Sequence, residues 1–438
     1  MSRVLRIEFR RSAVGAALIL LLVGAVLLHA APKRWAVGWL DLAMTQREYL
    51  LLLWPLALAA GAWQSRREHR ANVAELFAST ARPLAERAVP RLGALGIAVV
   101  CAYVTMAAVA APSIMDTASY LPLASFAVVA VGALALVAAT WLGLGIGRVI
   151  PSPLTAPVLA VAGIGLLLVL PFAVGSSEWL AMLLSPVDGM SQFTDFQTVP
   201  GRVSAAQGIW LTALAGSGVV LLAARSRRTQ AAALLPAVLG ALLGALVIPR
   251  GADFVPIPID PVAQEMVCAD GTPRVCISRT HGGLLAEVTP IARRALAVLA
   301  TLPEAPTTAQ EDTWFSAEKE PPPPSVDTVL FPVQVDVHGH LAHPGNALPQ
   351  MLDAAGVDMS SCTDSYDIRA ARAAAYWLMG RQPVAEPGEP AELNAEAVTL
   401  WRGLQVLPEA EARARVAAVR EAALACEDIQ GLLSRSSE

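Results

Sequence analysis

The sequence predicts an α-helical, multi-span membrane protein with a soluble α+β domain at its carboxyl end. Of its 438 residues, 55% are hydrophobic and 16% are charged, whereas about a quarter are charged in a typical soluble domain. Apolar runs of about 20 residues, enough to cross a bilayer, recur up to residue 248. The charge divides at the same place, with a net of +8 up to Pro249 and −12 from Arg250 onward.

Residues 1–12 alternate arginines with apolar side chains, as in a helix on the cytoplasmic membrane surface. The transmembrane domain is expected over residues 13–248. Its first apolar run is longer than the hydrophobic part of a usual signal peptide, so we interpret it as a retained span. Seven spans are predicted: Ser12–Ala31, Tyr49–Trp63, Leu92–Ala111, Leu121–Gly147, Leu154–Val174, Ile209–Ala224 and Ala231–Ile248. The second is short, and we expect it to begin near Met44.

Short loops rich in Arg stay in the cytoplasm. This rule places the amino terminus, the basic loop 64–91 and the Arg225–Arg228 turn on the cytoplasmic side of the cell membrane. The acidic residues 249–438 then lie outside as an extracellular domain, and their charge argues against nucleic acid as a partner. Four basic residues in the predicted outer loops are exceptions to the rule: Lys33, Arg34, Arg47 and Arg202.

Four of the five cysteines, Cys268, Cys276, Cys362 and Cys426, lie in the carboxyl-terminal domain. An even set in an exported domain predicts two disulfides, with three possible pairings. We favour Cys268–Cys276, which would close a hairpin, and Cys362–Cys426, which would join distant helices. The alternative is four unpaired thiols in a cytoplasmic tail. Cys101 lies within a span and is expected to be an inert apolar residue.

The carboxyl-terminal domain is expected to be mainly helical. Asp270-Gly271 is a turn signal within a hairpin over Val267–Ile277. Thr289-Pro290 predicts the start of a helix that ends near Leu302. Further elements are a stiff linker at Glu320–Ser325, an edge strand at Val329–Val337, and helices over Asn346–Ala355, Asp364–Gly380, Ala391–Leu404 and Pro408–Leu433.

The basic loop 64–91 contains a short amphipathic helix, Asn72–Thr80, with apolar residues at helical spacing. A loop that only connects two spans needs no such helix, so we interpret it as a docking surface for a cytoplasmic partner. The candidate docking residues are Asn72, Val73, Glu75, Leu76, Phe77, Ser79 and Thr80. The alternative is a solvated basic loop that only sets the topology.

Several nucleotide-binding and catalytic motifs are absent from the sequence. No lysine follows a glycine, so the chain has no Walker A loop and cannot hydrolyse ATP by that route. Neither H-E-x-x-H nor G-x-S-x-G occurs. We expect Gly143–Gly147 to serve close helix packing rather than dinucleotide binding. The predicted spans are nearly free of ionisable residues, which argues against an ion-coupled carrier.

One histidine cluster is a candidate metal site. His338, His340 and His343 lie within six residues, with Asp336 nearby as a possible ligand or orienting group. Three imidazoles could bind a zinc- or copper-type ion. The spacing matches no strong template, and a chance cluster is the alternative. We predict no catalytic residue and no cofactor from the motifs.

The chain resembles actinobacterial ABC-2-type transporter permeases over roughly residues 1–225. The resemblance rests on the arginine-rich amino terminus, on Arg66–Pro83, and on Gly143–Pro151 with the prolines that follow. It implies a six-span core, a separate ABC ATPase subunit and a second permease copy or paralogue. It also implies that Asn72–Thr80 is the coupling helix that docks on the ATPase. The seventh span and the extracellular domain depart from the family pattern.

The sequence therefore predicts the permease subunit of an ATP-driven transporter, an exporter by expectation, embedded in membrane lipid. Two alternatives from other classes remain. The first is a membrane-anchored extracellular binding or scaffold protein whose carboxyl-terminal domain carries the function. The second is a surface enzyme that uses a metal ion at the histidine cluster.

Overall fold

The computed structural model describes residues 14–70, 84–175, 177–251, 254–314, 321–359, 362, 367–385 and 390–434. The chain forms two compact units. Unit 1 comprises residues 1–116 and 121–260, and unit 2 comprises residues 117–120 and 261–438. The predicted surface helix at residues 1–12 and the predicted coupling helix Asn72–Thr80 lie outside the described residues.

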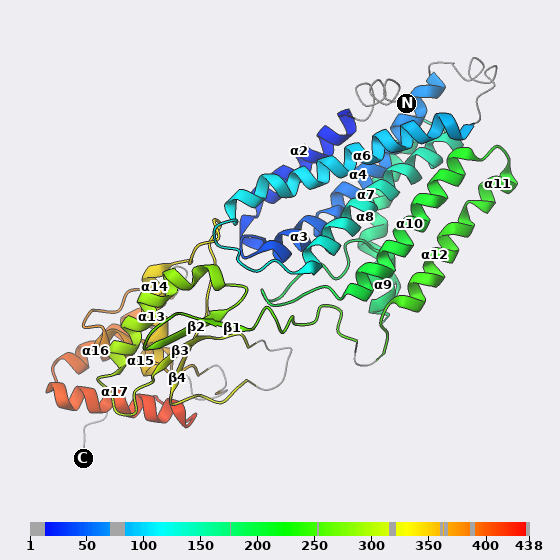
Figure 1. Ribbon diagram of the computed structural model, residues 1–438. Helices are drawn as coiled ribbons and strands as arrows, with labels where there is room; N and C mark the ends of the chain where they lie inside the picture. The colour runs from blue at the N-terminus through cyan, green and yellow to red at the C-terminus, as the bar shows by residue number, and fades with distance from the viewer. Residues whose placement is uncertain are drawn as a thin grey trace. The chain divides into compact units, whose positions relative to one another are not determined.

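Unit 1 is a bundle of long apolar helices (Figure 1). Its elements are α2 (Val14–Ala30), η2 (Pro32–Arg34), α3 (Trp39–Glu48), α4 (Leu50–Arg70), α6 (Leu84–Ala110), η3 (Ala111–Ser113), α7 (Leu123–Val149), α8 (Thr155–Ala173), α9 (Glu178–Leu184), α10 (Gly201–Ala223), α11 (Arg227–Ala232) and α12 (Leu234–Val247). Helix α7 is central and packs against α3, α4, α6 and α10.

The helices of unit 1 fall at all seven predicted spans. Within the described residues, five helical stretches are long and apolar enough to cross a membrane: Ala88–Ser113, Leu123–Val149, Thr155–Ala173, Gly201–Ala223 and Arg227–Val247. Helix α2 is apolar but has only 17 residues. Helix α4 has 21 residues and ends in a polar, basic segment. The apolar helices indicate insertion into a membrane, and seven spans stay a prediction.

The predicted start of the second span near Met44 is wrong. Met44 belongs to α3, a separate helix of 10 residues, and α4 begins only at Leu50. Helix α3 packs its apolar side chains into a core formed with α7, α9 and α10, including Leu40, Met44 and Met182. Residues 39–48 of the predicted outer loop are therefore a largely buried helix.

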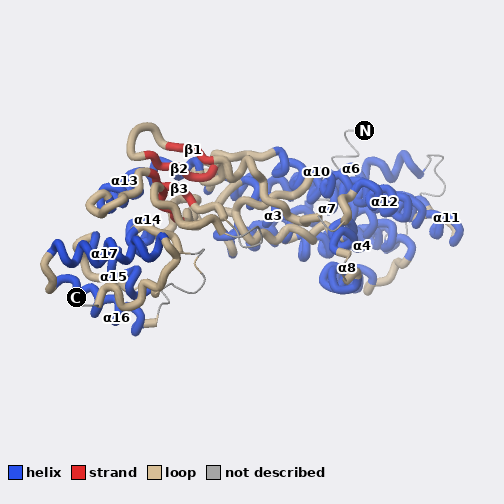
Figure 2. The backbone as a smooth tube through the Cα atoms, turned by 90° about the horizontal axis from the view of Figure 1, so that it is seen from below, coloured by secondary structure: helices blue, strands red, loops and turns tan. Residues whose placement is uncertain are grey.

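Unit 2 contains a four-stranded sheet in the order β1-β2-β3-β4. The strands are β1 (Met266–Cys268), β2 (Arg274–Ser278), β3 (Thr308–Glu311) and β4 (Thr328–Phe331). The first pair is antiparallel, and β2, β3 and β4 are parallel. Helix α13 (Leu285–Leu299) connects β2 to β3 and packs beside both strands (Figure 2). This connection is a βαβ unit, the usual way to join parallel neighbours.

The remaining elements of unit 2 are helical: η4 (Gly282–Leu284), α14 (Pro344–Met351), η5 (Asp353–Ala355), α15 (Ile368–Leu378), α16 (Ala391–Gln405) and α17 (Glu409–Leu424). They share one apolar core with the sheet, and Ala292, Phe331, Ala371 and Val416 are buried in it. Unit 2 is thus a mixed domain dominated by helices, as the sequence predicts.

Both favoured disulfide pairings agree with the structure, where Cys268–Cys276 and Cys362–Cys426 are at bonding distance. Cys268 and Cys276 are directly opposite each other in the β1–β2 hairpin. Cys101 is a free thiol on α6.

Three predictions about unit 2 are wrong in detail. Helix α13 begins at Leu285 rather than after Thr289, because buried Leu284 and Val288 extend its apolar face toward the amino end. Strand β4 ends at Phe331, where the next residue is a proline without an N–H for the ladder. Helix α17 ends at Leu424, well before the predicted end.

Candidate functional site: a buried polar cluster in unit 1

Helix α3 carries polar side chains into the interior of unit 1. Asp41, Thr45, Gln46 and Arg47 are all buried, and Arg47 has 0% of its surface exposed. The same short helix also buries Leu40 and Met44. It is therefore surrounded by protein, although its composition resembles that of a surface helix.

Arg47 links α3 to two other parts of unit 1. Its Nε donates to the carbonyl oxygen of Pro186 at 2.9 Å, and its Nη2 donates to Oε1 of Gln207 on α10. The Gln207 amide nitrogen in turn donates to the carbonyl oxygens of Met182 at 2.6 Å and Ser185 at 3.3 Å. One chain of hydrogen bonds thus joins α3, α9 with its following segment, and α10.

Gln46 links α3 to a different helix. Its Nε2 donates to the carbonyl oxygen of Tyr103 on α6 at 2.5 Å. The Tyr103 side chain is fully buried and lies against Gly132 of α7, where a Cβ would collide with the ring. We call Gln46, Arg47, Tyr103 and Gln207 the buried polar cluster.

The charge of Arg47 has no acidic partner among its hydrogen bonds. Both described acceptors are neutral, and Nη1 forms no hydrogen bond within the described part of the chain. The Tyr103 hydroxyl likewise has none there. An ionised group taken out of water costs several kcal/mol unless it is well paired. Such an arrangement inside a membrane domain indicates a functional role more than a stabilising one.

The sequence patterns do not reveal this cluster. They place Arg47 in an outer loop, as an exception to the positive-inside rule, and the predicted spans themselves are nearly free of ionisable residues. The available signal was the segment Trp39–Glu48, which contains neither Gly nor Pro and can continue as a helix. The partners Pro186 and Gln207 are more than 130 residues away, so spacing could not identify them.

Helix α4 contacts α7 with almost no side chains between the two backbones. A Cβ on Gly61 would meet the backbone of Thr140, and a Cβ on Gly143 would meet the carbonyl of Leu58. On Gly147 it would lie 2.7 Å from the carbonyl oxygen of Ala62. The prediction that Gly143–Gly147 serves close helix packing is therefore confirmed.

Helix α7 contacts α10 in the same manner. A Cβ on Gly145 would lie 2.7 Å from the carbonyl oxygen of Gly218, and Gly218 lies against the backbone of Trp141. Small residues that let backbones approach closely are a common basis of helix association in membranes. Helices α4, α7 and α10 thus form a tightly packed trio.

The predicted docking residues, from Asn72 to Thr80, lie outside the described residues. Their attachment points are described: α4 ends at Arg70 and α6 begins at Leu84. The loop is therefore connected directly to two long helices of unit 1.

The three candidate metal ligands in unit 2 are all exposed: His338, His340 and His343. His340 pairs through Nδ1 with Glu287 at 2.7 Å, and the backbone N–H groups of His338 and His340 donate to Asp336. Among the residues that the structure describes, no group of three or more His, Cys, Asp or Glu side chains could hold a metal ion. The geometry gives the metal hypothesis no support.

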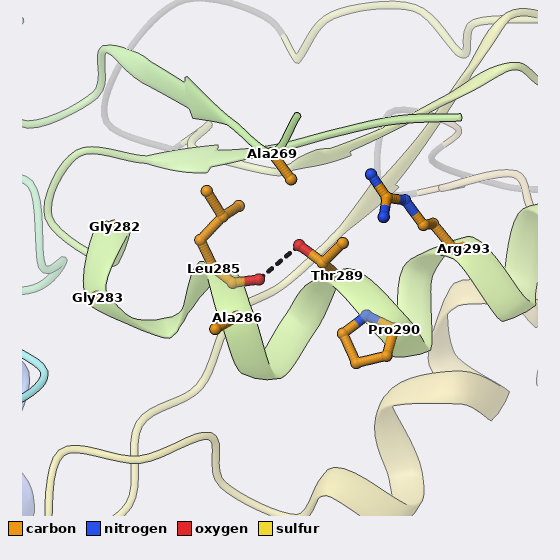
Figure 3. Close-up of a pocket in the computed structure, with 8 residues that line it drawn as sticks. All are labelled: Ala269, Gly282, Gly283, Leu285, Ala286, Thr289, Pro290 and Arg293. Carbon is orange, nitrogen blue, oxygen red and sulfur yellow. Dashed lines mark hydrogen bonds between the residues drawn. The ribbon is translucent and has the colours of Figure 1, made fainter. Parts of the chain in front are cut away.

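An open hollow of about 510 Å³ lies on unit 2 beside the start of α13 (Figure 3). Gly282, Gly283 and Ala286 line one part of it, and Arg293 lies at another. The Arg293 guanidinium donates to the carbonyl oxygens of Asp270 and Pro273, so it holds the hairpin turn. The guanidinium of Arg293 is thus already hydrogen-bonded to the hairpin, and we assign no ligand to the hollow.

The fold and the cluster define a helical membrane protein with a disulfide-containing soluble domain. The chain matches no family model, no curated protein and no solved structure.

Proposed function

We propose that this chain is the membrane permease subunit of an ATP-driven ABC-type transporter, working as an exporter in the cell membrane. A separate ABC ATPase subunit supplies the energy, since the sequence has no Walker A loop. A second permease copy or paralogue completes the path. In this proposal the amino terminus is cytoplasmic and unit 2 is extracellular, an orientation supported by the charge pattern and by disulfides that suit an oxidising compartment.

The observation that carries the proposal is the continuity of α3 and α4. Helix α3 ends at Glu48 and α4 begins at Leu50, so a single residue separates them. Gln46 and Arg47 of the buried polar cluster lie at the junction of the two helices, and the far end of α4 leads into the loop with the predicted coupling helix. A displacement of α4 would therefore move Arg47 relative to Gln207.

The packing of α4 suggests how such a displacement spreads. Its close backbone contact with α7 leaves little room for independent movement, because packed interfaces switch between discrete arrangements rather than deform smoothly. Closure of the ATPase dimer would push on Asn72–Thr80 and switch the α4–α7 pair to a second packed arrangement against α10, across the contact of Gly145 with Gly218. The hydrogen bond between Arg47 and Gln207 would then break in one half of the transport cycle and re-form in the other half.

In this mechanism the buried polar cluster is the outer closure of the path. The closed arrangement keeps Arg47 between neutral acceptors, and the unsatisfied charge makes that state costly enough to be reversible. Opening hydrates the guanidinium or exposes it to a passing substrate. ATP hydrolysis in the partner subunit selects between the two states through their different contacts at the loop.

Co-purification tests the proposal. The full chain, extracted gently from its membrane, should carry a nucleotide-binding subunit, and the double substitution Leu76→Ala/Phe77→Ala should remove it. Charge reversal at Arg66, Arg67 and Arg70 should weaken the association. The same reversal at Arg225, Arg227 and Arg228, on another predicted cytoplasmic turn, is the matched control. Preparations that never contain an ATPase would contradict the proposal.

The second candidate is a membrane-anchored binding or scaffold protein. A cavity of about 490 Å³ in unit 2 favours it, because this volume is typical of small-molecule sites. Deletion of residues 261–438, which belong to unit 2, distinguishes the two. Under the permease proposal, the truncated chain still binds the ATPase. Under the scaffold hypothesis, an ATPase is absent from both forms and the partner of the full chain is lost on truncation.

A further inference from the structure

Unit 2 contains a cavity of about 490 Å³ at the carboxyl ends of its parallel strands. Asp312 directly follows β3 and Pro332 directly follows β4, and both line it. The opposite walls come from α14, η5 and α15. The volume is typical of small-molecule sites, and the carboxyl ends of parallel strands are where ligands bind in open α/β sheets.

The cavity lining is acidic in balance. Three carboxylates line it, Asp312, Asp353 and Asp358, against a single basic side chain, Arg372, in the described lining. Asp312 accepts a hydrogen bond from the backbone N–H of Trp314 at 2.9 Å. Burial raises the pKa of Asp312, and the nearby charges of Asp358 and Glu311 raise it further. A cation in the cavity would offset this crowding of negative charge.

The rest of the lining is apolar and adaptable. Met351 and Met359 contribute flexible side chains that fit irregular shapes. Tyr376 on α15 adds an aromatic face, and Leu330 and Ile368 complete much of the wall. A ligand that fills this space therefore needs an apolar body as well as a charge. A bare metal ion fits less well, because no group of three metal-binding side chains occurs among the described residues.

The cavity wall formed by η5 and Gly356 has an unusual backbone conformation, which hydrogen bonds from Arg420 stabilise. Ala354, Ala355 and Gly356 have positive φ angles of 44°, 55° and 84°. Such a conformation costs energy for alanine and persists only where the surroundings enforce it. Arg420 on α17 donates to the carbonyl oxygens of Ala355 at 3.0 Å and Gly356 at 3.4 Å. The wall is therefore fixed in shape before any ligand arrives, which lowers the cost of binding.

We propose that this cavity binds a small organic cation, with an ammonium group facing Asp312 and Asp358 and an apolar or aromatic body against Met351, Met359 and Tyr376. The site lies entirely within unit 2, so it stands whether or not the chain transports a substrate.

Calorimetric titration of the full chain in nanodiscs tests the site. The probes are phenethylammonium, the anion 3-phenylpropanoate and the neutral 2-phenylethanol, which share an aromatic body and differ in charge. We expect the cation to bind with a dissociation constant of about 1 mM or tighter, and the other two at least about tenfold more weakly. Equal binding of cation and anion would overturn the proposal.

Isosteric variants locate the site. Asp312→Asn and Asp358→Asn should each weaken phenethylammonium binding about tenfold or more. Asp327→Asn removes the same charge from an exposed residue of unit 2 outside the cavity lining and should have no effect. Thermal unfolding of each variant shows whether it remains folded, and the cation should raise the melting temperature of the wild type and of Asp327→Asn alone.

Two results would contradict the assignment even if the cation binds. Binding unchanged in both Asp312→Asn and Asp358→Asn would place the ammonium elsewhere. Heat from Mg²⁺ or Ca²⁺ that is lost in the same variants would make the cavity a metal site instead.

Discussion

Arg420 should contribute more to the stability of unit 2 than any exposed charge. It lies on α17 with 2% of its surface exposed and donates to four carbonyl oxygens. The two shortest hydrogen bonds go to Val326 at 2.8 Å and Ala355 at 3.0 Å, and longer ones go to Glu304 and Gly356. The side chain thus joins α17 to three segments that are distant in the sequence.

The expected loss follows from these contacts. Hydrogen bonds to charged groups contribute roughly 1.5–3 kcal/mol each, so the two short ones amount to about 3–6 kcal/mol. Arg420→Met removes them but also removes a buried charge, which returns part of that free energy. We expect a net loss of about 3 kcal/mol, which lowers the melting temperature of a domain of about 180 residues by roughly 6–12 °C.

Limited proteolysis during heating measures this in the full chain, because cleavage within residues 261–434 reports the opening of unit 2. The control is Arg413→Met on the same helix, where an exposed arginine pairs with Glu409 four residues earlier. Such pairs contribute less than about 0.5 kcal/mol, so its curve should stay close to that of the wild type. If Arg420→Met unfolds as late as Arg413→Met, the proposed role of the carbonyl contacts is refuted.

Three further predictions concern stability and packing. Loss of the Cys362–Cys426 disulfide, with a sequence separation of 64, should cost roughly 4 kcal/mol of stability, and loss of Cys268–Cys276, with a separation of 8, roughly 2.5 kcal/mol. Denaturant unfolding of two variants, each with both cysteines of one disulfide replaced by serine, checks this order. Gly143→Ala should loosen the contact of α4 with α7 at a cost of about 1–3 kcal/mol, whereas Gly165→Ala, where a Cβ meets nothing within 4 Å, should be neutral in the same detergent-melting assay. Burial raises the pKa of Asp312, so the contribution of the Asp312 carboxyl to stability is present in full below about pH 4 and is lost as the pH rises through the raised pKa. Between about pH 4 and 7, the free energy of unfolding should therefore fall less steeply with pH for Asp312→Asn than for the wild type. Identical slopes for the two proteins would contradict this.

The features that the sequence predicted well are those with a local signal. Apolar runs located the long helices of unit 1, and Asp270-Gly271 located the β1–β2 hairpin. An even number of cysteines in one domain, with one pair bracketing that turn, was enough to favour the disulfides that form. The glycines of Gly143–Gly147 predicted close packing because only small residues permit it.

The features that were missed depend on distant partners. Strand β3, Thr308–Glu311, has a polar sequence, and Glu311 is buried only because Ser278 and His281 are there to bond its carboxylate at 2.7 and 2.6 Å. In the sequence, Arg47 resembles an ordinary loop arginine, and only the folded structure brings it into contact with Pro186 and Gln207. Hydropathy and spacing contain no information about such contacts, so buried polar groups escape them.

In the proposed mechanism, ATP use at the cytoplasmic loop opens the buried polar cluster, and cysteine accessibility tests this step without a known substrate. Ser204, on α10 one turn before Gln207, has 6% of its surface exposed. In a Cys101→Ala background, Ser204→Cys should react slowly with a membrane-impermeant maleimide in the complex with its ATPase. Addition of ATP should raise the rate several-fold, while the exposed control Ser191→Cys should not change. An unchanged rate at Ser204→Cys while the bound ATPase hydrolyses ATP would contradict the account.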